Sequence, residues 1–335
     1  MTYFPQKGIA LITALLIVAL ASTAAVSITS QLQLEIRRNS NILHHDQAYI
    51  YALAAEDFAR YGLKLDYDNN KTDHLDELWH TIPVAEEVEG GTLLATLDDK
   101  QGLFNLNNLA NKRPIDQQRF QRLLSILELD ASEKQTITAT LTDWLDSDQI
   151  SELGYGAEDD YYQGLAEPQR PYLAGNRLLS ELSELRLIKG FSKEILQKLR
   201  ITTQLDTETG EALPAIFTVL PEYTAININT APAEVIKSLD NKMTDEIVNN
   251  IISKRRGKVD EGGAAEPFGS VGDFNNYLQS LSVNDVATEA VTVATSYFSL
   301  KAKTTIGQSQ MNLQSILHRN DTGISTVVRR SQGVI

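Results

Sequence analysis

The sequence contains no cysteine, few aromatic residues and fewer basic than acidic residues. Of its 335 residues, 7% are aromatic, and 30 Lys and Arg stand against 44 Asp and Glu, which gives a formal net charge of −14. The absence of cysteine excludes disulfide scaffolds, thiolate zinc sites and a cysteine nucleophile. The acidic balance argues against a nonspecific phosphate binder, whose affinity comes from clustered Lys and Arg. Because 42% of the residues are apolar, the chain can still form a packed core, and its length is typical of about two domains.

Charge is absent from a long stretch near the N-terminus. No charged residue occurs between Gly8 and Leu34. The apolar run Ile9–Ile28 would be about 30 Å long as a helix, which is enough to cross the hydrocarbon core of a membrane. Lys7 and the terminal amine are the nearby positive charges ahead of this run. They predict a cytoplasmic N-terminus and an outward-facing remainder of the chain.

A cleavable secretory signal is the alternative for this stretch, because a basic start, an apolar run and small residues such as Ala19 and Ala21 fit its description. Two features argue against it: the apolar run continues past the small residues, and an amphipathic pattern follows without a break. The residues of that pattern recur at helical spacing, namely Leu32, Ile36, Leu43, Ile50, Ala54, Phe58 and Tyr61. We therefore predict one helix over 9–62 that ends at Gly62, since glycine tolerates the left-handed cap.

The hydrophobic pattern changes twice in the rest of the chain. A strand is predicted over Thr92–Leu97, and mainly helical spacing follows from Gly102 to about Leu281. Alternation of Phe298, Leu300 and Ala302 with polar residues then predicts a half-buried strand. Further strands are predicted around 310–317 and 324–328. This order predicts an α+β fold with a helical insertion.

The N-terminus also resembles a known family. A very short leader ending in Lys7-Gly8 joins directly to an apolar helix that continues as an amphipathic one, and this arrangement resembles the type IV pilin and pseudopilin N-terminus. The resemblance implies that a prepilin peptidase cuts between Gly8 and Ile9 and methylates the new amine.

One residue departs from the usual pilin pattern. Most pilins carry a glutamate at the fifth mature position, where this chain has Thr13. A carboxylate at membrane depth is costly unless it is paired with a cation. A subunit with Thr13 therefore does not need an amine from a neighbouring subunit. Among pseudopilins this absence is typical of the K-type minor subunit of type II secretion (the general secretion pathway protein K family). That subunit is thought to lie at the pseudopilus tip and is distinguished by a helical insertion.

An acidic segment within the helical block is a candidate metal site. Between Asp143 and Asp160 the segment has seven carboxylates and no Lys or Arg, and Gly154 and Gly156 allow sharp turns. Calcium prefers six to eight oxygen ligands on a flexible loop. The spacing is not that of an EF-hand, and composition alone leaves a solvated acidic loop and a metal site equally open.

The resemblance to K-type subunits favours calcium for this segment. It covers DWLDSD and GAEDDYY, and Pro171-Tyr172 and Asn176-Arg177 complete the match. Because the family is known to bind calcium in its helical domain, the resemblance implies a structural calcium site. The implied ligands are Asp143, Asp146, Asp148, Glu158, Asp159 and Asp160.

A weak internal repeat raises a second possible function. The segments 104–110 (FNLNNLA) and 226–232 (ININTAP) have Asn at alternate positions, which can hydrogen-bond free amides at a helix start. The second copy, with Lys254–Lys258 (KRRGK) and Phe268–Phe274 (FGSVGDF), looks like a helix-hairpin-helix module. A membrane-anchored or secreted DNA-binding protein is therefore the alternative. The segment 238–246 between the helices has three carboxylates and lacks the glycines of a phosphate-binding hairpin, which favours a packing role.

Signs of catalysis are weak. The sequence has no Gly-x-Ser-x-Gly and no phosphate loop of the Walker type. His74 and His80 lie near acidic residues, but their interval does not place them on one helix face. We expect that the chain is not an enzyme.

The resemblance therefore implies a pilin-like long N-terminal helix with an antiparallel sheet and a large inserted all-α domain. The function implied is that of a minor pseudopilin, anchored in the bacterial inner membrane by a single pass with its body in the periplasm, which initiates and caps the pseudopilus tip for export of folded proteins. The implied partners are the I-type and J-type minor pseudopilins, then the H type, the major pseudopilin, prepilin peptidase and the inner-membrane assembly platform, with no nucleic acid. The expected divisions are a leader (1–8), the N-terminal helix (9–62), the start of the α+β domain (63–103), the inserted domain with helix-hairpin-helix-like repeats (104–288) and the C-terminal β part (289–335).

Overall fold

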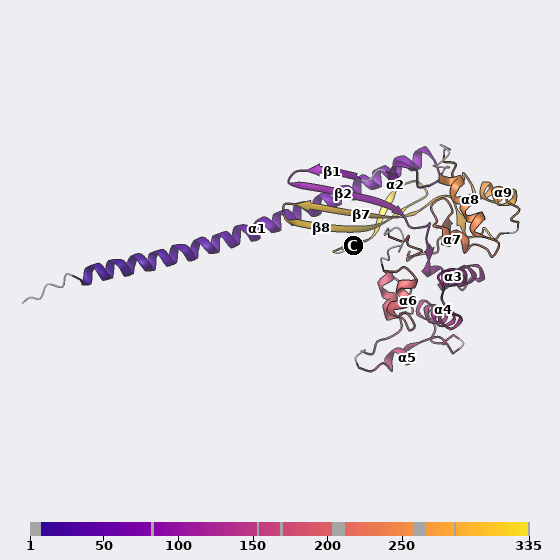
Figure 1. Cartoon of the computed structure of the whole chain (residues 1–335), viewed down its shortest axis with the longest axis horizontal. Helices are drawn as coiled ribbons and strands as arrows, with labels where there is room; N and C mark the ends of the chain where they lie inside the picture. The colour runs from indigo at the N-terminus through magenta and orange to yellow at the C-terminus, as the bar shows by residue number, and fades with distance from the viewer. Residues whose placement is uncertain are drawn as a thin grey trace, which may run out of the picture.

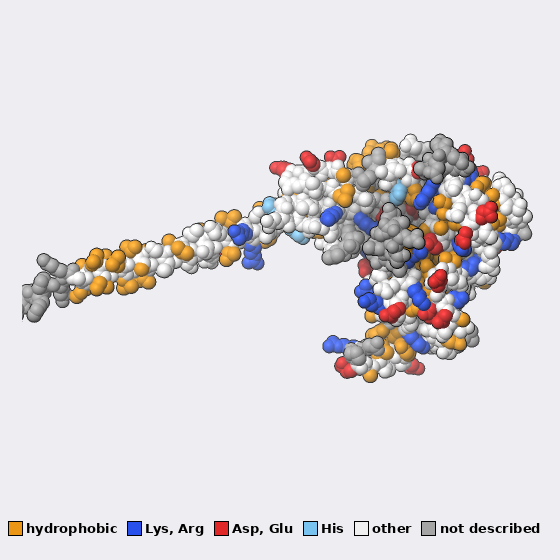
Figure 2. Space-filling view, viewed as in Figure 1, with side chains coloured by type: hydrophobic (Ala, Val, Ile, Leu, Met, Phe, Trp, Pro, Cys, Tyr) orange, Lys and Arg blue, Asp and Glu red, His pale blue; other side chains and the backbone are white. Residues whose placement is uncertain are grey.

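A single long helix sets the outline of the molecule (Figure 1). The computed structural model describes residues 8–81, 84–152, 154–167, 170–202, 212–256, 265–284 and 286–333; the predicted leader before Gly8 lies outside them. Helix α1 spans Ile9–Asn69 and is long and apolar enough to cross a membrane. Its first part projects away from all other elements and is covered with hydrophobic side chains (Figure 2). Unlike a core helix, its most apolar window is wholly unburied, as expected for an anchor that meets lipid.

The end of α1 differs from the prediction. The helix does not stop at Gly62 but continues for seven more residues to Asn69. Leu63 is fully buried against the sheet, and Arg319 donates to the Leu63 carbonyl and contacts Asp66. These tertiary contacts fix the last two turns, so the low helix propensity of one glycine does not end the helix.

The second part of α1 packs against a five-stranded antiparallel sheet. The strands are β1 (Val84–Val88), β2 (Gly91–Asp99), β7 (Tyr297–Ile306), β8 (Ser309–Arg319) and β9 (Ser325–Gln332), in the order β1-β2-β7-β8-β9. Alternate residues of β2, β7 and β8 are buried against α1 and form one core. The predicted strands correspond to β2, β7, β8 and β9. Strand β1 was not predicted, because this mostly exposed edge strand carries Glu86 and Glu87 in place of an apolar alternation.

A second core lies in an insertion between two neighbouring strands. The chain leaves the sheet after β2 and returns at β7, where Asp99 pairs with Phe298. Most of the insertion lies at the end of the sheet away from the projecting helix (Figure 1). Helix α2 (Leu78–Thr81) precedes β1. The elements of the insertion are β3 (Phe104–Asn105), η1 (Leu106–Asn111), α3 (Pro114–Ile126), α4 (Ala131–Leu145), α5 (Asp159–Gln163), η2 (Leu182–Leu187), α6 (Lys193–Lys198), β4 (Phe217–Thr218), β5 (Ile226–Asn227), α7 (Ala233–Lys237), α8 (Asp245–Arg256), α9 (Val271–Ser280) and β6 (Val291–Thr292).

The two copies of the internal repeat use their asparagines in the same way. Asn105 and Asn227 accept hydrogen bonds from the amides two residues on, as predicted. The next Asn of each copy is buried and holds a distant segment through both its amide atoms: Asn107 exchanges bonds with Leu179, and Asn229 exchanges bonds with Phe268. The repeat is therefore a packing unit: in each copy, a buried asparagine side chain hydrogen-bonds to the backbone of a distant segment.

Two of the basic residues after the second repeat, Lys254 and Arg255, have partners within the protein. Arg255 is buried and donates to the carbonyls of Ile228 and Ala231 at 2.6 and 2.5 Å. Lys254 is paired with Glu266 at 2.8 Å. Lys258 lies outside the described residues. A DNA-backbone contact needs basic groups free at the surface, which these two residues do not supply.

Candidate metal centre

The end of helix α4 contains the first carboxylates of the acidic segment. The helix begins with a capping box in which Asp130 accepts from the Glu133 amide and Glu133 accepts from the Asp130 amide, at 2.8 Å each. It ends with Asp146 as its C-cap, so that Asp143 and Asp146 lie one turn apart on adjacent levels of the same face. Trp144, which lies between them in the sequence, is buried, and its ring contacts the ring of Tyr162 edge-to-face with the ring centroids 5.4 Å apart. The apolar side of α4 thereby fixes where its carboxylates lie.

Asp143 closes the loop that follows α4. Its fully buried carboxylate accepts from the amide of Glu152 at 3.1 Å and from the amide of Ala157 at 2.7 Å. The loop backbone approaches so closely that a Cβ at Gly156 would lie 1.9 Å from Asp143 Oδ2, and Gly154 has φ +77°. These two glycines therefore permit the turn that the sequence predicted, and Asp143 shapes the loop.

Three carboxylates meet inside this loop. Asp146, Asp148 and Glu158 each place one oxygen within 4.8 Å of the others. Glu158 is 6% exposed, and neither of its oxygens has a hydrogen-bond partner among the described residues. Burial, together with the negative charges of Asp143 and Asp146, raises the pKa of Glu158 to about 7. An unsatisfied buried carboxylate is costly, and a bound cation would remove that cost.

Two of the predicted ligands lie apart from this group of three. Asp159 Oδ1 accepts from the amide of Ala174 at 2.8 Å, which ties the loop to the following segment. Asp160 is exposed in the first turn of α5. Of the six predicted residues, the structure thus gathers Asp146, Asp148 and Glu158, while Asp143 and Asp159 hold the backbone around them.

Sequence reasoning missed Lys112 at this group, and it named Asn176 only as part of the family resemblance. Lys112, at the end of η1, lies 3.0 Å from Asp146 Oδ2 and 3.5 Å from Glu152 Oε1. Asn176 has a buried side-chain oxygen without a partner among the described residues, and the next amide, of Arg177, bonds to the Trp144 carbonyl at the end of α4. Both lie outside the acidic segment, so the spacing within that segment assigned no role to either residue.

The arrangement suits a hard divalent cation. Carboxylate and amide oxygens on a loop are ligands that calcium prefers, and several can be monodentate. Glu158, Asp146 and Asp148 would hold the ion.

A second cluster of carboxylates lies at the end of α1. Asp66, Asp73 and Glu77 also place oxygens within 4.8 Å of one another. Here the protein supplies its own cation, since Arg319 donates to Asp73 Oδ1 at 2.6 Å and its Nη1 lies 3.4 Å from Asp66 Oδ2. Glu77 accepts from Trp79 Nε1, Asn70 Nδ2 and the His74 amide at 2.7, 2.9 and 3.0 Å. The cluster is thus largely satisfied without a metal.

Comparisons with known proteins agree on one family. Two family models, both described as type II secretion system (T2SS), protein K, match residues 102–203 and 226–295. Type II secretion system protein K of Pseudomonas aeruginosa is 33% identical, with 98% of this chain and 93% of the relative covered. The protein K of Klebsiella pneumoniae is 34% identical over 67% of this chain and 66% of that protein.

A solved structure has the same fold. It is the crystal structure of the GspK-GspI-GspJ complex from the type 2 secretion system of enterotoxigenic Escherichia coli. The matched chain has a TM-score of 0.70 and 24% identity, with 89% of this chain and all of that chain covered. None of these relatives is described as a DNA-binding protein, so the helix-hairpin-helix alternative is not supported. The chain belongs to the type II secretion system protein K family and is a minor pseudopilin of that system.

Proposed function

We propose that this chain initiates the pseudopilus and caps its tip. The observation that carries the proposal is Thr13. Its hydroxyl donates to the Ala10 carbonyl of the same helix at 3.0 Å, so the polar group is satisfied within α1. A glutamate at this depth would require a cation from a neighbouring subunit. Thr13 creates no such requirement, which suits the first subunit of a filament.

The position of the insertion also supports a terminal place. Its helices lie at the end of the sheet that is farthest from the projecting part of α1 (Figure 1). In a filament whose subunits align their N-terminal helices, this bulk would stand where the next subunit belongs.

Anchoring and processing follow from the same helix. We propose that the apolar part of α1 crosses the inner membrane once, with the body in the periplasm. Helix α1 begins at Ile9 with Gly8 as its N-cap, and this boundary supports the proposed cleavage between Gly8 and Ile9. N-terminal sequencing should give a methylated Ile9; a start near Ser22 would instead indicate a cleaved secretory signal.

The proposed partners are the I-type and J-type minor pseudopilins. The related chain in the solved structure is part of a complex with GspI and GspJ. The H-type subunit, the major pseudopilin, prepilin peptidase and the assembly platform would follow in assembly and processing. The role is structural, and we assign no reaction to the chain.

We further propose that calcium binds Asp146, Asp148 and Glu158. The supporting observation is the pair of unpartnered oxygens on buried Glu158. When bound, the ion would neutralise the loop that joins α4 to α5; Asp143 and Asp159 would hold the loop backbone in place for it.

The tip position is tested by labelling. A gold-labelled epitope inserted in the Asp206–Glu208 segment of the chain should appear at one end of isolated pseudopili by electron microscopy. The same label on the major pseudopilin should decorate the shaft and serves as the control. Labels of this chain distributed along the shaft would overturn the proposal.

A further inference from the structure

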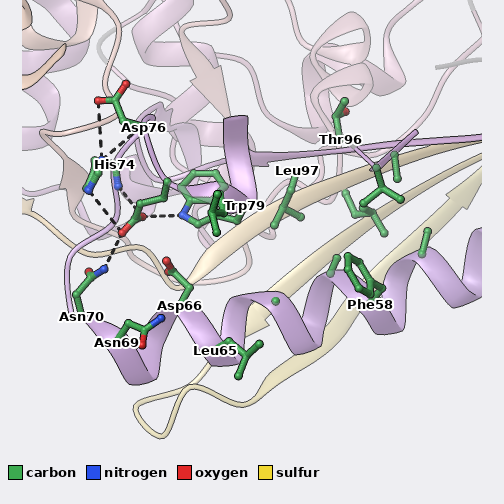
Figure 3. Close-up of a pocket in the computed structure, with 18 residues that line it drawn as sticks. Phe58, Leu65, Asp66, Asn69, Asn70, His74, Asp76, Trp79, Thr96 and Leu97 are labelled. Atoms are coloured by element: carbon green, nitrogen blue, oxygen red, sulfur yellow. Dashed lines mark hydrogen bonds and ion pairs between the residues drawn. The ribbon is translucent and has the colours of Figure 1, made fainter. Parts of the chain in front are cut away.

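A cavity of about 590 Å³ lies beside α1, away from the metal centre (Figure 3). Its walls come from the second part of α1, the segment that leads to helix α2, α2 itself, and strands β1, β2 and β7. The larger apolar residues among those that line it are Phe58, Leu65, Leu78, Trp79, Val84, Leu97 and Leu300. Cavities of this size with mostly apolar walls and a few polar groups are typical of binding sites.

Small residues on α1 create the hollow. Ala55, Ala59 and Gly62 line the cavity from the helix side. A Cβ added at Gly62 would meet no atom within 4 Å. The space is therefore open next to the helix, and a group entering it would contact the backbone of α1 closely.

The rim of the cavity is apolar and exposed. Leu78 is 73% exposed and Phe58 is 61% exposed. Ile50 and Tyr61, which recur with Phe58 at helical spacing on α1, are further exposed apolar residues. Clustered apolar side chains in water are unfavourable and mark contact surfaces.

One end of the cavity is acidic. Asp66, Asp76 and Glu77 line it together with His74, whose Nε2 lies 3.6 Å from Glu77 Oε1. Glu77 already accepts three hydrogen bonds, and Asp76 lies 4.0 Å from His74 Nδ1. Asp66 makes one polar side-chain contact among the described residues, with Arg319 at 3.4 Å, and Arg319 is bound more closely to Asp73 and to the Thr295 carbonyl. Asp66 can therefore accept from another cation.

We propose that this cavity receives a large apolar side chain flanked by Lys or Arg from a neighbouring subunit. The apolar group would fill the hollow between α1 and α2, and the basic group would pair with Asp66. The charge of the cavity end selects a cationic partner, and the exposed apolar residues at helical spacing on α1 favour a segment that runs along this helix. This inference rests on the proposed function as an assembly subunit, because the occupant is supplied by another subunit.

The absence of cysteine allows the site to be probed by thiol protection. The variants Phe58→Cys in the cavity and Asp68→Cys outside it each give the full-length chain one thiol on α1. Maleimide labelling is compared in membranes with and without the I-type and J-type subunits. We expect labelling of the cavity thiol to slow at least tenfold when those subunits are present, with little change at position 68. Equal rates at both positions, or no slowing, would overturn the proposal.

Two further variants test the cavity without a thiol. Gly62→Leu should fill the hollow without steric conflict, and Asp66→Asn removes the carboxylate, with Asp68→Asn as the matched control on the same helix. Gly62→Leu and Asp66→Asn should weaken co-purification of the full-length chain with the other minor subunits several-fold, and the effect of Asp66→Asn should vanish at high salt. Unchanged co-purification with both variants, whose melting temperatures confirm folding, would contradict the proposal.

The outcomes separate this inference from the proposed function. If the wild-type chain does not associate with other minor pseudopilins, the proposed function fails. If it associates while the cavity thiol stays reactive, the function stands and the inference is wrong. Protection in the purified chain alone that is lost on dialysis would assign the cavity to a small molecule, which also contradicts the proposal.

Discussion

The two carboxylate clusters of this protein differ in how their negative charge is balanced. At the end of α1, buried Arg319 neutralises Asp73 and contacts Asp66. In the acidic loop, half-exposed Lys112 contacts Asp146, while Glu158 is buried without a hydrogen-bond partner among the described residues. The difference teaches that three close carboxylates do not by themselves indicate a metal: what matters is whether the fold supplies a buried cation. The following predictions test this comparison.

Removing Arg319 should have the largest effect. Arg319→Met leaves Asp73 buried without its cation, and breaking a buried pair in this way costs about 3–5 kcal/mol in the free energy of unfolding. The measurement is denaturant unfolding of the full-length chain in detergent. Trp79, which contacts Phe298 at 5.3 Å, reports on the sheet core, and buried Trp144 reports on the insertion.

Lys64→Met is the control for this prediction. It removes the exposed ion pair of Lys64 with Asp68 and should change stability by less than about 1 kcal/mol. Equal effects of the two variants would show that Arg319 is not the internal cation of its cluster.

Calcium should stabilise the chain through the acidic loop alone. At a hundred times the dissociation constant, a bound ion adds about 2.7 kcal/mol to the free energy of unfolding. Glu158→Gln should abolish the calcium-induced rise in melting temperature and its reversal by EGTA. Asp66→Asn, in the other cluster, and exposed Asp160→Asn should retain both, and a retained response in Glu158→Gln would remove Glu158 from the ligand set.

Without calcium, stability should fall as pH rises from about 4.5 through about 7. The pKa of Glu158 is raised to about 7 in the folded protein from its ordinary 4.5, chiefly by burial. The folded state therefore keeps a proton that the unfolded state loses, and deprotonation favours unfolding. The pKa of Asp66 is likewise raised to about 7 from its ordinary 3.8, mainly by burial. Deprotonation of Asp66 therefore also lowers stability as the pH rises from about 3.8.

Calcium should separate these two contributions. It binds the deprotonated loop and should cancel the part due to Glu158, leaving the parts due to Asp66 and to Asp73, whose pKa burial raises to about 6. The check is the unfolding midpoint against pH for the wild type and Glu158→Gln, each with calcium and with EGTA. A calcium-insensitive slope in the wild type would contradict the assignment.

Removing Lys112 should have the smallest effect. Lys112→Met removes a 3.0 Å ion pair with Asp146, which costs less than about 1 kcal/mol without calcium. Because the ammonium group competes with the ion for this carboxylate, calcium affinity should rise about fivefold at most. Lys198→Met is the matched control, since Lys198 has similar exposure and pairs with Glu133 away from the loop. Calcium titration by calorimetry distinguishes the two variants, and a lower affinity in Lys112→Met would be inconsistent with competition.

Local patterns predicted most of the sheet and the start of the helix. Strands β2, β7 and β8 carry alternating apolar residues because one face packs on α1, and that period is visible in the sequence. The predicted end of α1 at Gly62 was wrong, and strand β1 was not predicted. Leu63 and Asp66 are held in the helix by the sheet and Arg319, and β1 is held by its pairing with β2.

The acidic segment shows the same division at the site. The sequence predicted that carboxylates and glycines would form a loop after α4, and the structure contains that loop. It could not assign roles to Asp143 and Asp146, which are one turn apart and chemically identical. The closing of the loop directs Asp143 to backbone amides and leaves Asp146 beside Asp148 and Glu158.

The sequence by itself determined the apolar helix, the absence of a carboxylate at Thr13, the order of the helical and β segments and the family resemblance, because these depend on residue type and on spacing along the chain. The tertiary structure decided which carboxylates share a space, which have an internal cation and where α1 leaves a cavity. These properties depend on residues distant in sequence, such as Arg319 beside Asp73 and Lys112 beside Asp146. Coulomb interaction and desolvation act through distance in space, which no local pattern records.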